Sequence, residues 1–381
     1  MTREDLSAWI DENAPRELWG TASTPFQGHW GGTKVGFPSE AHRVWYERCI
    51  VKGWTAPTWP KQYGGGGESV EWHRMWREEL IARGMPLPLV GIGLTMIGPI
   101  LMQEGTDAQK AEHLPGIIDG SQRWAQGYSE PEAGSDLASL QCKAEVTEGG
   151  YRITGQKTWT SHADLSDWIF CLVRTSEDKH TGITFVLFRL DQPGITVRPI
   201  ELISGASPFC EVFFDSVFVA DRNVIGQVGD GWRVAKALLR HERGMVGESI
   251  AAGGARLPEL QRWTLRKAFL ESGDEDPLLR DAVARSEMDQ EAMRLTVKRS
   301  NDKLKAGSKP GAESSIFKLF GTELNQRRWE LGVQITGSEA LLWEHPLGRQ
   351  WLRSRGNSIE GGTSEVQRNI VARRVLGLPK P

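Results

Sequence analysis

The sequence predicts an α+β protein in which a central antiparallel β region lies between two helical regions. Three observations support this fold class. Apolar residues recur at helical spacing up to about residue 120, short β-branched and aromatic runs fill residues 121–221, and helical spacing returns over residues 231–376. Because the strands do not alternate with helices, the pattern differs from that of a doubly wound parallel sheet. With 381 residues, the chain is long enough for two or three domains.

The N-terminal region, residues 1–122, is predicted to be a helical domain. WHRMWREELIARG has its apolar residues at helical spacing, and a threonine can cap a helix over Asp107–Leu114. The stretch Met85–Met102 carries no charge, but it contains three prolines and three glycines and lacks anchoring flanks. We therefore interpret it as a buried core helix with its entrance loop and expect no membrane span.

Residues 123–222 are predicted to form the β domain, as an antiparallel sheet or small barrel. Five runs separated by Gly, Pro and Asp turns are typical of strands: YRITGQKTWTS, DWIFCLVR, GITFVLFRL, GITVRPI and FCEVFFDSVFV. Residues 223–381 are predicted to be helical again, with the acidic stretch Glu271–Pro277 as an exposed loop between two helices.

Composition and missing motifs exclude several classes of function. A net charge of −3 gives no basic surface for nucleic acid. No GxGxxG motif occurs, which disfavours a Rossmann domain. The N-terminus has no apolar signal segment, and the cysteines are far apart without a CxxC pair, which argues against a zinc site and disulfides. We expect a cytoplasmic protein without a metal. The cysteines are Cys49, Cys142, Cys171 and Cys210.

Two stretches near the start of the β region are candidates for binding a ligand. QGYSEPEAGSDLASL offers backbone N–H groups and a hydroxyl at Gly134 and Ser135, as a phosphate- or ring-binding loop would. About twenty residues later, Trp159 is followed by Thr160 and Ser161, so its ring could stack on a planar ligand whose edge these neighbours hydrogen-bond. A polar surface turn and a core tryptophan are the structural alternatives.

Two glutamates could act as a catalytic base. Glu242 lies three and four residues from two leucines on one side and from Met245 and Val246 on the other, which puts its carboxylate on the apolar face of a helix. Burial there would raise its pKa and make it a suitable general base. Alternatively it pairs with Arg240 or Arg243.

Glu360 lies in SIEGGTSEVQRN, before a second helix. Ser364 and Gln367 have the spacing of a capping box, which predicts a helix from about Glu365 with Glu360 in the preceding loop. Such a helix N-terminus can bind anions. Glu360 itself is either a base or a solvated charge at the helix entrance.

Together these stretches resemble the acyl-CoA dehydrogenase family of flavoproteins. The resemblance rests on GWTAPTWPKQYGG, YSEPEAGSD, GQKTWTS, FFDSVFVADRNVIGQVGDGW, the HERG helix and IEGGTSEVQRNIVARRVLGLP, in that order. It implies a helical N-terminal domain, a central β domain, a C-terminal four-helix bundle, FAD as cofactor, and a homotetramer or heterotetramer whose flavins each contact two subunits. It also implies α,β-dehydrogenation of an acyl-CoA thioester to a trans-2-enoyl-CoA in lipid β-oxidation, with electrons passing to an electron-transferring flavoprotein.

The resemblance also assigns the binding residues. The serine at position 129 is expected near the reactive flavin nitrogen, and Trp159 and Ser161 beside the ring system. Ser135 and Arg243 are expected to contact the substrate. The residues expected to bind FAD are Gln126, Tyr128, Ser129, Ser135, Trp159, Ser161, Gln334 and Gly337 (adenine half, from the neighbouring subunit), and Thr363 and Glu365 (ribose and phosphates).

The resemblance favours Glu242 as the base. In the medium-chain branch the base precedes a Gly-Thr-Ser triplet, and here that position is occupied by Gly361. The long-chain and isovaleryl branches instead carry the base in a Glu-Arg pair on the preceding helix, which here is Glu242-Arg243. Glu360 would need a one-residue shift of its loop and remains the alternative.

Two departures from the family pattern concern the flavin contacts made by a neighbouring subunit. The family's Arg-x-x-Phe-Gly segment is not recognisable between Leu257 and Asp289, and Ser338 replaces a glycine of the adenine-binding segment. These changes resemble branches that act on bulky thioesters, some of which assemble from two different chains. The alternatives are an oxidase or monooxygenase of the same fold and a non-catalytic partner subunit.

Overall fold

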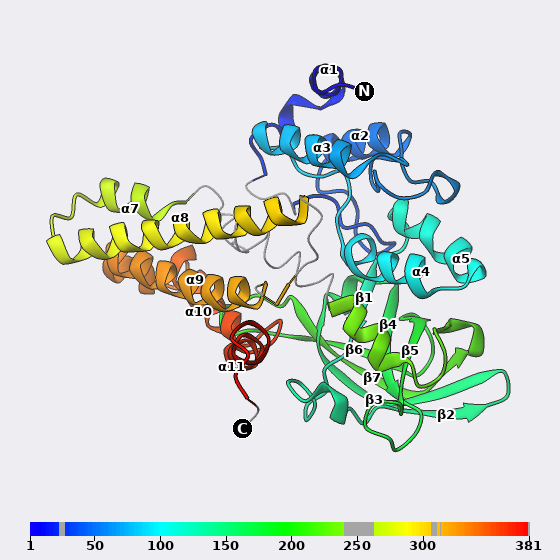
Figure 1. Cartoon of the computed structure of the whole chain (residues 1–381). Helices are drawn as coiled ribbons and strands as arrows, with labels where there is room; N and C mark the ends of the chain where they lie inside the picture. The colour runs from blue at the N-terminus through cyan, green and yellow to red at the C-terminus, as the bar shows by residue number, and fades with distance from the viewer. Residues whose placement is uncertain (23–26, 240–262, 306–310, 313, 380–381) are drawn as a thin grey trace. The chain divides into compact units, whose positions relative to one another are not determined.

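The computed structural model describes residues 1–22, 27–239, 263–305, 311–312 and 314–379. The described residues form two compact units, one from 1–200 and 207–241 and the other from 201–206 and 242–381. The first unit contains the N-terminal helices, coloured blue to cyan in Figure 1, and all the described strands, coloured green. The three-domain boundaries after residues 122 and 222 stay a prediction.

The N-terminal helices begin at side chains that cap them. Ser69 accepts a hydrogen bond from Trp72 N at the start of α3, and Thr106 forms a capping box with Gln109 at the start of α5. Both helices were predicted, and α5 continues four residues past Leu114. The elements are α1 (Arg3–Asn13), η1 (Arg16–Leu18), α2 (Glu40–Ile50), η2 (Lys61–Tyr63), α3 (Val70–Ala82), η3 (Gly93–Ile97), α4 (Gly98–Glu104) and α5 (Asp107–Ile118).

Tryptophans fill the core of this helical region. Trp45 and Trp76 are fully buried with their ring centroids 5.5 Å apart, and Trp54 contacts Trp9 and Trp72 at 4.6 and 4.7 Å. The charge-free stretch Met85–Met102 forms a loop followed by η3 and α4, much of it buried, as predicted. Within the described ranges, no helix has the length and apolar character needed to cross a membrane.

The strands form a sheet in the order β6-β7-β3-β2-β4-β5-β8, with β1 paired to β4. Its pairs are antiparallel except β1–β4 and β2–β4. The five predicted runs are β3 to β7, and β1, β2 and β8 are additional. The strands are β1 (Trp124–Gly127), β2 (Lys143–Thr147), β3 (Gly150–Ser161), β4 (Trp168–Arg174), β5 (Ile183–Arg189), β6 (Ile195–Ile200), β7 (Phe209–Ala220) and β8 (Val224–Ile225), with η4 (Leu137–Ser139), η5 (Ala163–Leu165) and η6 (Asp221–Asn223) between them.

The second unit is a helical bundle in which α9 contacts α7, α8, α10 and α11. Trp329 of α9 is fully buried and stacks on Trp263 at 4.9 Å. Between α7 and α8, residues 273–276 are exposed, as predicted for the acidic loop. The elements are α7 (Leu265–Ser272), α8 (Pro277–Lys305), α9 (Ser314–Thr336), η8 (Gly337–Leu341), α10 (Pro346–Ser354), η9 (Arg355–Ser358), α11 (Ser364–Ile370) and η10 (Val371–Val375).

Candidate functional site

The loop after β1 places its predicted binding residues in different environments. Gln126 and Ser129 are partly buried, and Ser135 is exposed at the tip of the loop. Tyr128 is 5% exposed, and its ring lies edge-on to Phe170 and Phe185 in the core of the sheet. A ligand outside the sheet would therefore meet the backbone of Tyr128 rather than its ring.

A buried ion pair holds the base of this loop. Lys157 on β3 has a fully buried side chain, and its Nζ donates to Glu130 Oε1 at 2.7 Å and to the Tyr128 carbonyl at 3.2 Å. Burial disfavours the ammonium charge, but the acidic groups around it, with Glu130 in direct contact, raise the pKa of Lys157. The Glu130 carboxylate also accepts the backbone N–H groups of Gln141 at 2.5 Å and Cys142 at 2.9 Å. One carboxylate thus ties together both ends of the segment 131–140.

The tip of the same loop is left open. Glu130 and Ala133 exchange two backbone hydrogen bonds of 3.1 Å, which makes the turn tight. Beyond it, Gly134 and Ser135 are exposed, and a Cβ atom added at Gly134 would meet nothing within 4 Å. A loop that is fixed at its base and open at its tip presents N–H groups and a hydroxyl to a ligand without further rearrangement.

Trp159 lies on a β-bulge beside this loop. The β3–β7 register shifts between Lys157 and Thr160, and Trp159 has φ +58° with 56% of its surface exposed. A left-handed backbone is unfavourable for a bulky residue, and bulges often redirect a side chain near an active site. The N–H of Thr158 donates to the carbonyl of Ser129 at 2.9 Å, so the bulge adjoins the loop. The exposed indole can therefore stack on a planar ligand that the loop also contacts.

Ser161 ends β3 and is half-buried, and His162 follows it with φ +49°. Burial, together with the positive charge of Arg123, lowers the pKa of His162, so the imidazole is neutral at pH 7.

Sequence reasoning missed Lys157, Glu130 and Arg123. Lys157 and Glu130 lie inside the quoted motifs GQKTWTS and YSEPEAGSD, and a lysine within an otherwise apolar strand was the available signal.

In the second unit, the predicted adenine-binding residues lie at the end of α9. Gln334 is exposed, and Gly337 begins η8 with φ +68° and open space around its Cα. Thr363 and Glu365 lie at the start of α11. Hydrogen bonds from its own backbone N–H and from Thr363 lower the pKa of Glu365, whose carboxylate is exposed.

The predicted capping box at α11 is wrong. The N-cap is Thr363, whose Oγ1 accepts a hydrogen bond from Val366 N at 3.2 Å, and the helix begins at Ser364. Gln367 instead turns back and donates to the Gly361 and Gly362 carbonyls, each at 3.4 Å. The hydroxyl of Thr363 and that of Ser364 are both suitable N-caps, so the sequence alone could not decide which of the two residues caps the helix.

Glu360 is engaged by two neighbours in its own unit. Its carboxylate accepts from Arg353 at 2.9 and 3.3 Å and from Asn357 at 2.5 Å. These hydrogen bonds occupy both oxygens of the carboxylate, which is typical of a structural carboxylate more than of a base. Glu242 and Arg243 lie outside the described residues.

Comparisons with known proteins match this architecture. Acyl-CoA dehydrogenase family models match three consecutive stretches: the N-terminal domain residues 13–121, the middle domain residues 125–217 and the C-terminal domain residues 229–376. The chain is 36% identical over 388 residues to acyl-CoA dehydrogenase IpdE1 of Mycobacterium tuberculosis, with 99% of this chain and 97% of that protein covered.

Two solved structures resemble the whole chain. The structure named Tcur3481-Tcur3483 steroid ACAD aligns with a TM-score of 0.75 and 27% identity, covering 100% of this chain and 97% of that one. The ChsE4-ChsE5 complex from Mycobacterium tuberculosis aligns with a TM-score of 0.73 and 26% identity, with coverage of 100% and 97%.

Proposed function

Because the chain belongs to the acyl-CoA dehydrogenase family, we propose that it catalyses FAD-dependent α,β-dehydrogenation of an acyl-CoA thioester to a trans-2-enoyl-CoA. When bound, FAD supplies the acceptor for the hydride that leaves the β-carbon. The observation that carries this proposal is the exposed indole of Trp159, held in a left-handed conformation beside the open loop 131–140.

The described residues fit a flavin. Trp159 offers a face for the ring system, and Ser161, two residues further on, offers a hydroxyl. Ser129 offers a second hydroxyl, because its carbonyl accepts the N–H of Thr158, the residue before Trp159. Gln126, the Tyr128 backbone and Ser135 would complete the first unit's contribution. In the second unit, Gln334, Gly337, Thr363 and Glu365 are all at least partly exposed. By the family resemblance, Gln334 and Gly337 would contact the adenine half of a neighbouring subunit's flavin, and Thr363 and Glu365 would lie near the ribose and phosphates.

The chain's own chemical task is to remove the α-proton. We assign it to Glu242 on the sequence pattern, because the apolar residues three and four positions away on each side predict an apolar helix face, where burial would raise the pKa of a carboxyl group. Ser135 and Arg243 are assigned to the thioester substrate. The occupied carboxylate of Glu360 supports this choice, since Arg353 and Asn357 already bind it.

We propose a bulky, steroid-like acyl group as the substrate and a second, different chain as the partner. One similar structure is named as a steroid enzyme, and both similar structures are named as pairs of proteins. The missing Arg-x-x-Phe-Gly segment and Ser338 agree with a partner that supplies part of the flavin site. An electron-transferring flavoprotein is the proposed electron acceptor, and a homotetramer is the alternative assembly.

The test is a panel of straight-chain, branched and steroid-side-chain acyl-CoA thioesters with an artificial electron acceptor. We expect mass spectrometry to find a product that is two hydrogens lighter, formed from the bulky thioester. Hydrogen peroxide formed in step with product would identify an oxidase instead. If activity needs a co-expressed chain and the Glu242→Gln variant stays fully active in that complex, the chain is a non-catalytic partner. The absence of a recognisable Arg-x-x-Phe-Gly segment between Leu257 and Asp289 favours this second candidate function, the non-catalytic partner.

Replacing Trp159 by glycine is expected to have opposite effects on folding and on binding. Glycine relieves the left-handed strain at φ +58° and stabilises the protein without FAD by about 1 kcal/mol. Loss of the stacking surface weakens FAD binding by about tenfold or more. Thermal unfolding and FAD titration measure the two effects.

The matched control is Ser216→Gly, since Ser216 is exposed on β7 with φ +54°. It should gain similar stability and leave FAD affinity unchanged. A Trp159→Gly protein that binds FAD as tightly as the native protein would exclude the stacking role.

A further inference from the structure

A buried histidine connects α5 to the sheet. His113 is fully buried, and its ring lies edge-on to Trp124 at 5.3 Å and to Trp168 at 4.7 Å. These two indoles begin β1 and β4, which pair with each other at this position, and the indoles stack at 5.3 Å. The aromatic joint, as we call His113 together with Trp124 and Trp168, therefore packs α5 against the starts of both strands.

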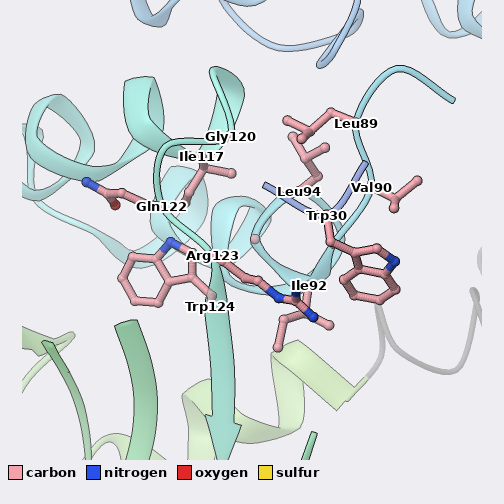
Figure 2. A pocket seen from close by; sticks show the side chains of 12 residues that line it. Trp30, Leu89, Val90, Ile92, Leu94, Ile117, Gly120, Gln122, Arg123 and Trp124 are labelled. Carbon is pink, nitrogen blue, oxygen red and sulfur yellow. The ribbon is translucent and has the colours of Figure 1, made fainter. Parts of the chain in front are cut away.

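The polar atoms of the aromatic joint are buried without partners. Within the described ranges, neither ring nitrogen of His113 has a hydrogen-bond partner, and the same holds for Nε1 of both indoles and for Gln122 Oε1. Figure 2 shows the side chains of Gln122 and Trp124 on one side of the chain and that of Arg123 on the other, beside Trp30. A neutral imidazole has one N–H donor, whereas an imidazolium has two donors and a full charge, and an indole nitrogen accepts nothing. Of these atoms, only Gln122 Oε1 could accept from a protonated His113.

The surroundings favour the neutral form of His113. Burial lowers its pKa, and the opposing attraction of Glu112 and Gln122 is weaker. Glu112 is exposed, and the buried carboxylate of Asp167 already accepts the backbone N–H of Arg123 at 2.8 Å. An imidazolium would therefore be a buried cation without a counterion in contact with it. The other titratable and charged groups on the elements that pack here are Asp107 and Lys110 on α5, Glu104 on α4 (paired with Arg233), Lys61 and Tyr63 on η2, Arg174 at the far end of β4, and Arg189 of β5, which lies over the Trp168 ring at 5.9 Å.

The aromatic joint lies just before the loop assigned to FAD. Trp124 is two residues before Gln126, and Glu130, which fixes the base of that loop, is four residues further on. β1 is only four residues long, and among the described strands it pairs with β4. A strand this short depends on the packing of its ends, so loss of the contact between α5 and Trp124 would also loosen the loop.

We propose that acid opens the aromatic joint: when His113 takes up a proton, α5 separates from the starts of β1 and β4, and the loop after β1 loosens. A histidine in an unfolded chain takes up its proton at about pH 6.5. Because the folded joint resists protonation, the unfolded chain binds more protons below this pH. The stability of the fold is therefore complete above about pH 6.5 and falls as the pH falls below it. The effect on folding goes beyond the proposed function, whereas the effect on FAD binding rests on it.

The test is urea unfolding of the full chain, with any partner chain that it requires, at about pH 7.5 and about pH 5.5, on either side of the usual histidine pKa. His113→Phe keeps an aromatic ring, His113→Gln keeps a polar side chain, and neither new side chain titrates. Over this range we expect the equilibrium constant for folding to fall about three- to tenfold more in the native protein than in either variant. In the FAD-loaded protein, the rise in flavin fluorescence that reports FAD release should be faster at the lower pH for the native protein than for His113→Phe.

The control is His180→Phe, because His180 is an exposed histidine whose ring also lies 5.3 Å from an indole, that of Trp232. It should keep the native pH dependence. Equal losses of the folding constant in the native protein and in both His113 variants would overturn the inference, and equal FAD release would overturn its link to the loop. A protein that takes up no FAD would overturn the proposed function instead, and the folding comparison would still decide this inference.

Discussion

Replacing Lys157 by methionine is expected to lower the free energy of unfolding by about 3–5 kcal/mol, because the partner carboxylate stays buried without its cation. The Lys157 side chain is fully buried and the Glu130 side chain is 7% exposed, so water cannot replace the lost ammonium. Glu130 also binds the N–H groups of Gln141 and Cys142. Its displacement would therefore release the base of the loop, and FAD affinity should fall as well. Urea unfolding followed by circular dichroism measures the stability change.

The matched control is an exposed ion pair between this loop and the segment that joins β4 to β5. Lys179 pairs with Asp136 at 3.1 Å, but these side chains are 59% and 63% exposed. Lys179→Met should cost at most about 0.5 kcal/mol, since exposed ion pairs contribute little. If Lys157→Met changed stability no more than Lys179→Met does, the buried pair would not be what fixes the loop.

Replacing Glu242 by glutamine is expected to reduce turnover by about 10²–10⁴-fold, the usual contribution of a general base. Glutamine has nearly the same shape and cannot accept the α-proton. Substrate binding should change little, so kcat falls more than KM rises. Stopped-flow measurement of flavin reduction by the acyl-CoA isolates this step from later electron transfer.

Glu360→Gln is the paired variant, because it removes the charge of the alternative base. Its carboxylate is 37% exposed and bound to Arg353, so we expect at most a small loss of stability and turnover within about tenfold of the native rate. If Glu360→Gln abolishes flavin reduction while Glu242→Gln preserves it, the assignment is reversed.

The sequence predicted the buried strands well because they are continuous apolar runs. β4 and β5 are buried along all but their last residue, and such runs cannot be accommodated at the surface. β2 was missed because it is short and mostly exposed. Ala144 and Val146 do alternate with polar residues, but two apolar residues in five are too few to distinguish a strand from a loop. β1 was read as part of the loop that follows it, because four residues are too short to show a period.

The candidate site was predictable only in part. The motifs around Trp159 and Ser135 could be identified from residue types and from the family resemblance. The bulge at Trp159 could not, because a register shift is set by the partner strand β7 and leaves no local pattern. The burial of Arg123 and Lys157 depends likewise on segments far away in the chain, such as Trp30 and Glu130. Charged residues are normally exposed, so composition alone predicts the opposite.

We propose that the loop fixed by Glu130 and the exposed ring of Trp159 form one wall of a flavin site at which a thioester is oxidised. The most direct measurement is the visible spectrum of the protein, purified with any partner chain it needs, before and after anaerobic addition of a bulky acyl-CoA. We predict a yellow protein whose absorbance band bleaches on this addition. A colourless protein that takes up no added FAD would contradict the claim.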